Sequence, residues 1–71
     1  MRFQDGDVVK IAKNSRFYGS GESNPKDTEG TVRVIQSRIW QYSVNWGEGR
    51  NAGYNDNDLR LVRRSNEISR R

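Results

Sequence analysis

The stretch Tyr42-Ser43-Val44-Asn45-Trp46-Gly47-Glu48-Gly49-Arg50-Asn51-Ala52-Gly53-Tyr54 predicts two strands joined by a tight turn. Aromatic or apolar residues occupy every second position from Trp40 to Trp46, which is the period of a strand with one buried face. Gly47 and Gly49 supply the positive φ angles that a short hairpin turn requires. Because an isolated hairpin is marginal in water, other strands must cover its aromatic face.

Three other segments are apolar enough to be those strands. Residues 8–13, 30–35 and 59–62 concentrate Val, Ile and Leu, which favour strands. In the second of them Val34 and Ile35 are consecutive, so a bulge that turns Ile35 inward is plausible. The sequence therefore predicts five short strands.

The connections between these strands differ in length. Residues 14–29 form a long polar loop that is interrupted only by Phe17 and Tyr18. The Asn and Asp side chains of residues 55–58 favour a turn or one short helical turn before the last strand. Residues 36–38 are expected to turn the chain into the aromatic strand.

Composition restricts the possible chemistry. The chain has 71 residues, enough for one small domain, and contains neither Cys nor His. Disulfides, thiolate nucleophiles, zinc sites of the Cys/His type and histidine general bases are therefore excluded. No pair of carboxylates is placed by spacing, so we expect no enzyme activity, no metal and no cofactor.

The positive charge is concentrated near the C-terminal end. The sequence has 13 Lys and Arg against 9 Asp and Glu, a net charge of +4. Four of the basic residues but only one acidic residue fall in the last nine positions, so residues 1–62 are about neutral. We expect residues 1–62 to form the domain and residues 63–71 to be a flexible basic tail.

No apolar run approaches the length of a membrane span, and residues 1–5 lack the apolar core of a signal peptide. A strand that follows the first Met so closely suggests a complete small gene product. The expected location is the cytoplasm.

Five strands with a long first loop and a helical turn before the last strand describe an all-β, partly open barrel of SH3 type. The chain resembles SH3-like domains in the segments Gly6-Asp7-Val8-Val9-Lys10-Ile11, Gly30-Thr31-Val32, Tyr42-Ser43-Val44-Asn45-Trp46 and Asn55-Asp56-Asn57-Asp58-Leu59. It is similar to mind-bomb/HERC-type and KOW-like barrels, to small bacteriophage proteins of this length, and to the PsaE-type subunit of photosystem I. The matched residues build the barrel, so the resemblance implies the fold more than the ligand.

A protein partner is the leading expectation for function. SH3 domains bind extended peptides in aromatic grooves, and aromatic and Arg side chains dominate interface energetics. The expected partner-binding residues are Arg16, Phe17, Tyr18, Trp40, Trp46 and Arg50. The alternative is that the aromatic residues simply form the core, as a chain this short requires. The bacteriophage resemblance implies a host protein as partner, met in the host cytoplasm.

Two other functions remain open at this point. Arginines could neutralise phosphates of a nucleic acid, and the candidates are Arg33, Arg38, Arg60, Arg63 and Arg64. Alternatively, the chain could be a small structural subunit of a larger complex, as the PsaE-type resemblance implies.

Overall fold

The computed structural model describes residues 2–21 and 23–65 and consists of one antiparallel sheet. The sheet has the order β4-β3-β2-β1-β5. A 3₁₀ turn, η1, precedes the last strand. The elements are β1 (Val8–Ile11), β2 (Gly30–Val34), β3 (Tyr42–Gly47), β4 (Arg50–Tyr54), η1 (Asp56–Asp58) and β5 (Leu59–Arg63). The predictions of an all-β fold, five strands, a long first loop and a helical turn are confirmed.

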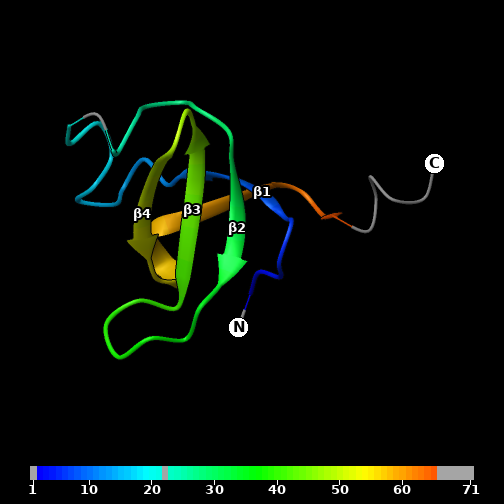
Figure 1. The fold of residues 1–71 in the computed structure, drawn as a ribbon. Coiled ribbons are helices and arrows are strands. Elements are labelled where there is room, and N and C mark those ends of the chain that lie inside the picture. The colour runs from blue at the N-terminus through cyan, green and yellow to red at the C-terminus, as the bar shows by residue number, and fades with distance from the viewer. Residues whose placement is uncertain (1, 22, 66–71) are drawn as a thin grey trace.

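The sheet is bent into two parts that face each other. Strands β2, β3 and β4 run side by side, and β1 and β5 cross behind them at a steep angle (Figure 1). Within the described residues no ladder joins β4 to β5, so both are edge strands. The closure expected of a barrel is therefore not seen.

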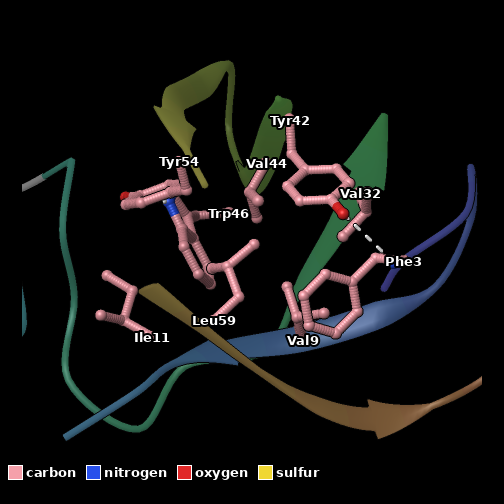
Figure 2. Packing of buried hydrophobic residues seen from close by; sticks show 9 residues of the cluster. All are labelled: Phe3, Val9, Ile11, Val32, Tyr42, Val44, Trp46, Tyr54 and Leu59. Atoms are coloured by element: carbon pink, nitrogen blue, oxygen red, sulfur yellow. Dashed lines mark hydrogen bonds between the residues drawn. The ribbon is translucent and has the colours of Figure 1, made fainter. Parts of the chain in front are cut away.

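The core lies between the two parts of the sheet (Figure 2). From β3 it receives the alternating side chains Tyr42, Val44 and Trp46, which are at most 5% exposed, whereas Ser43 and Asn45 face outward. The other members of this cluster are Phe3, Val9, Ile11, Val32, Tyr54 and Leu59. The alternation read from the hairpin is thus confirmed within β3.

The hairpin turn is built as its glycines predicted. Gly47 and Gly49 have the predicted positive φ values, 104° and 75°. Glu48, between them, also has a positive φ of 57°, which was not predicted, and Gly47 faces Arg50 across the turn. Positive φ at both central residues is the pattern of a type I′ turn, which suits the twist of the flanking strands. The pairing shifts by one residue between Asn45 and Gly47, so the turn is joined to the ladder through a bulge.

Several strand boundaries differ from the prediction, and β1 ends at Ile11 instead of residue 13. Strand β3 begins at Tyr42, and Trp40 lies in the preceding loop, residues 35–41. Strand β2 ends at Val34, and Ile35 is 42% exposed, so no bulge turns it inward. The loop is closed instead by hydrogen bonds from the N–H groups of Ile35 and Gln36 to the Gln41 carbonyl, at 3.0 and 3.2 Å.

The predicted tail begins too early. Arg63 is the last residue of β5, and the Ser65 N–H donates to the Asp7 carboxylate at 2.9 Å. Both residues therefore belong to the folded domain. The rest of the predicted tail, residues 66–71, lies outside the described residues.

Candidate functional site

Two loops bring aromatic side chains together on one side of the molecule. Phe17, from the loop between β1 and β2, packs edge-to-face on Trp40, with ring centroids 5.8 Å apart. Arg16 places its guanidinium carbon 4.9 Å from the centre of the Phe17 ring. We call Arg16, Phe17, Tyr18, Ile39 and Trp40 the loop surface. Four of these five residues were predicted to bind a partner, and Ile39 was missed.

The first loop is held by the η1 turn. The Ser15 hydroxyl donates to the Asp58 carboxylate at 3.0 Å and accepts the Phe17 N–H at 3.1 Å. The Ala12 N–H donates to the Asp58 carbonyl at 2.8 Å. These contacts fix the backbone on which Arg16, Phe17 and Tyr18 follow one another.

The second loop is held by the residue just before η1. The Asn55 amide donates to the Ile39 carbonyl at 3.2 Å and accepts the Gln41 N–H at 2.8 Å. Within the loop, the Ser37 hydroxyl accepts the Trp40 N–H at 3.0 Å. One short segment, residues 55–58, therefore sets the position of both aromatic loops, which no local sequence pattern reveals.

Trp40 packs against Gly53 in the edge strand β4. A Cβ atom built on Gly53 would come within 2.4 Å of the indole Cδ1, so only glycine leaves room for the ring. Trp40 is half-buried as a result, whereas its neighbour Ile39 is 68% exposed. A single exposed Ile is common, but this one directly precedes Trp40, whose ring packs on Phe17.

Tyr54 connects the loop surface to the core. Its ring packs edge-to-face on both Phe17 and Trp46, with centroids 5.8 Å apart in each case. Its hydroxyl accepts the Trp46 indole N–H at 3.2 Å and lies 2.9 Å from the Ser23 carbonyl oxygen. Burial raises the pKa of Tyr54, and the nearby Asp58 carboxylate adds to that rise, so the hydroxyl stays neutral.

Two predicted partner-binding residues do not belong to this surface. Trp46 is 5% exposed and is part of the core, because it continues the inward alternation of β3. Arg50 lies at the hairpin turn, where its guanidinium donates to the Gly47 carbonyl at 3.3 Å. The hairpin turn and the loop that carries Trp40 are at opposite ends of β3 (Figure 1), about 20 Å apart for a strand of this length.

The arginines of the nucleic-acid alternative come from several elements, although Arg60 and Arg64 line one hollow. Arg33 projects from the outer face of β2, Arg38 from the loop after it, and Arg60 from β5. Arg63 pairs with Glu29, and Arg64 pairs with Asp7, both at 3.1 Å.

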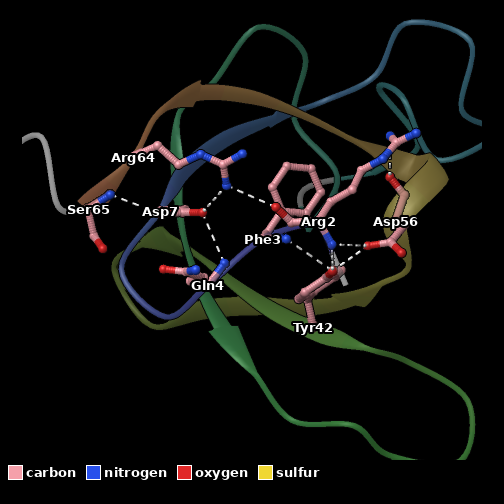
Figure 3. A network of polar contacts seen from close by, with 8 residues as sticks. All are labelled: Arg2, Phe3, Gln4, Asp7, Tyr42, Asp56, Arg64 and Ser65. Carbon is pink, nitrogen blue, oxygen red and sulfur yellow. Dashed lines mark hydrogen bonds and ion pairs between the residues drawn. The ribbon is translucent and has the colours of Figure 1, made fainter.

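A polar network ties the two ends of the domain together (Figure 3). The Asp7 side chain is fully buried and accepts hydrogen bonds from the Gln4 N–H, the Ser65 N–H and the Arg64 guanidinium. Burial alone would raise the pKa of Asp7, but these three donors together lower it below its usual value. This buried carboxylate is fully satisfied, and its role is structural.

A second carboxylate lies at the other end of the same network. The Asp56 carboxylate accepts a hydrogen bond from the Tyr42 hydroxyl, and this hydrogen bond lowers the pKa of Asp56. Burial and the Asp56 carboxylate raise the pKa of Tyr42. The Tyr42 oxygen also accepts the Arg2 and Phe3 N–H groups at 3.1 and 3.3 Å, which fixes the N-terminal segment.

Across residues 2–21 and 23–65, no three His, Cys, Asp or Glu side chains are grouped so that they could hold a metal ion. In the same part of the chain, no helix has the length and apolar character to cross a membrane. Comparison with known proteins finds no matching family model, no matching curated protein and no matching solved structure. The function must therefore be argued from the geometry of the chain itself.

Proposed function

We propose that the protein is a non-enzymatic binding module that recognises another protein through the loop surface. The observation that carries the proposal is Ile39, which precedes the half-buried Trp40 and is 68% exposed, while its backbone carbonyl accepts a hydrogen bond from the Asn55 amide. Apolar and aromatic anchors in a fixed backbone lose little conformational entropy on binding, which favours affinity.

The charge around the anchors indicates the chemistry of the partner. Arg16 and Arg38 are both exposed, and they directly precede Phe17 and Ile39 in the sequence. Arg16 stacks on Phe17, which orients its guanidinium without neutralising it. We therefore propose a partner that offers an apolar side chain with carboxylates or carbonyl oxygens beside it. The resemblance to small bacteriophage proteins would make that partner a host protein.

An affinity capture experiment from a nuclease-treated bacterial lysate tests this function. We expect a protein retained by the wild-type chain at high salt, and its loss with Ile39→Asp and with Trp40→Ala. Thr31→Asp is the matched control, because Thr31 is exposed on β2 and is not part of the loop surface. Retention of the same protein by the Ile39 and Trp40 variants would refute the role of the loop surface.

Nucleic-acid binding is a second candidate, and Arg33 favours it. This side chain makes no ion pair with any described residue and lines a hollow of about 370 Å³ with Ser43, Asn45 and Asn51. Hydroxyl, amide and guanidinium donors on one face suit phosphate oxygens. Binding of this kind should weaken steeply with salt and should be reduced by Arg33→Ala but not by Ile39→Asp.

A further inference from the structure

A hollow of about 640 Å³ lies along the outer edge of β5, apart from the loop surface. Its volume is in the range of about 300–1,000 Å³ that is typical of ligand pockets. It is lined by Phe3, Leu59 and Leu61, which are apolar, and by Arg2, Arg60 and Arg64. Leu61 packs on the core but is only partly buried, so the hollow exposes apolar surface.

The β5 backbone along this hollow has no partner strand. Strand β5 pairs with β1 on one side, and within residues 2–21 and 23–65 no strand pairs with it on the other. The N-terminal segment passes nearby and is held by the Arg64 guanidinium, which donates to the Arg2 carbonyl at 2.9 Å (Figure 3). An unpaired edge of this kind is a template for an added strand.

The charge at this edge is positive. Arg60 faces Lys10 directly across the β1–β5 ladder, and neither side chain forms an ion pair with any residue that the structure describes. Like charges opposite each other in a sheet are unfavourable, and an acidic ligand would relieve that cost. At the hollow, Arg64 pairs with the Asp7 carboxylate, and Arg2 lies against Asp56, to which its N–H and guanidinium donate at 3.2 and 3.4 Å.

We propose that the β5 edge binds an extended acidic peptide segment of another protein as an added strand. The segment would place an apolar side chain over Leu61 and would pair a carboxylate with Arg60, which would also offset the repulsion between Arg60 and Lys10. This is a second interaction surface, independent of the loop surface.

The chemistry of the hollow favours a peptide over the other possible occupants. A single-stranded nucleic acid needs exposed aromatic rings for stacking, and the ring at this site, Phe3, is 4% exposed. Residues 66–71 of the same chain include Ile68 but carry two arginines against one glutamate, so their side-chain charge has the same sign as that of the hollow and does not favour binding there.

Titration of the full ¹⁵N-labelled chain with a synthetic peptide of alternating Glu and Val tests the proposal. We expect amide shifts along β5 and at Phe3, and a dissociation constant raised about tenfold by Arg60→Glu. Arg33→Glu is the matched control, because Arg33 is an equally exposed arginine on the outer face of β2, and this variant should leave the affinity unchanged. Ile39→Asp should also leave it unchanged, which separates this site from the proposed function.

Four results would overturn the proposal. One is no shift at peptide concentrations up to about 1 mM. Another is equal binding of a peptide of alternating Lys and Val, and a third is displacement of the Glu peptide by a single-stranded oligonucleotide. The last is tighter binding after Ile68→Ser, which would assign the hollow to the chain's own residues.

Discussion

Strand β3 and the loop before it, residues 35–41, each carry one tryptophan, and the two indoles have opposite environments. Trp46 is 5% exposed and donates its indole N–H to Tyr54, whereas Trp40 lies half-buried against the edge of β4 beside an exposed Ile39. The β2–β3 ladder reaches Tyr42, which faces Val34, and does not extend back to Trp40. Alternation therefore assigns a side chain to the core only as far as strand pairing continues.

The largest expected difference between the two regions comes from truncating each tryptophan. Trp46→Ala should lower the free energy of unfolding by about 3–5 kcal/mol, because it removes a buried ring from a small core. Trp40→Ala should cost about 1 kcal/mol but abolish partner capture. Urea unfolding monitored by circular dichroism measures both, and equal losses of stability would contradict the distinction.

Two glycines provide the same comparison without removing an indole. A Cβ on Gly30 would lie 2.5 Å from Trp46 Cε3, and a Cβ on Gly53 would lie 2.4 Å from Trp40 Cδ1. Gly30→Ala should destabilise by about 1–3 kcal/mol, since the core around Trp46 cannot rearrange freely.

Gly53→Ala should instead push Trp40 toward solvent, with a loss of about 1 kcal/mol and weaker partner binding. Thermal unfolding together with tryptophan emission wavelength distinguishes the two variants. If the tryptophan emission shifted to the red in Gly30→Ala but not in Gly53→Ala, the assignment of Trp46 to the core and of Trp40 to the surface would be contradicted.

Asp7 offers a further test, because it stabilises the domain through hydrogen bonds that involve neither tryptophan. Asp7→Asn should cost about 2 kcal/mol at neutral pH, since the donors Gln4, Ser65 and Arg64 lose a charged acceptor. Capture of the partner by the folded fraction should be unchanged.

The same carboxylate gives a pH dependence with a definite sign. The pKa of Asp7 is lower in the folded chain than its usual value of 3.8, so its contribution is complete above that value. The contribution is lost as the pH falls through the folded pKa. The wild type should therefore lose more stability than Asp7→Asn on acidification below pH 3.8, measured by urea unfolding across that range. Parallel losses would contradict the role of Asp7.

The smallest effect is expected where the two regions meet. Tyr54→Phe keeps the ring contacts with Phe17 and Trp46 but removes the acceptor of the Trp46 indole N–H. A cost of about 1 kcal/mol follows from leaving that donor unsatisfied. Amide hydrogen exchange should also rise in the first loop, whose Ser23 carbonyl loses its contact with the hydroxyl. Unchanged exchange there would mean that Tyr54 does not anchor the loop.

Four of the predicted partner-binding residues belong to the loop surface. The sequence identified Phe17 because an aromatic residue is unusual in the polar segment 14–29, and the structure shows that its ring packs on Trp40. Ile39 was missed because it adjoined the aromatic run that predicted a strand. The roles of Gly53 and Asn55 could not be predicted, since each acts on a residue distant in the sequence.

The sequence by itself determined the all-β class, the five strands, the tight glycine-containing hairpin turn and the inward face of β3. These features depend on local backbone preferences and on the two-residue period, which neighbouring residues encode. Only the tertiary structure decided where the ladder stops, which tryptophan enters the core and which arginines are paired. Those outcomes depend on contacts between segments dozens of residues apart, such as Ser15 with Asp58 and Asp7 with Arg64, and no local pattern records them.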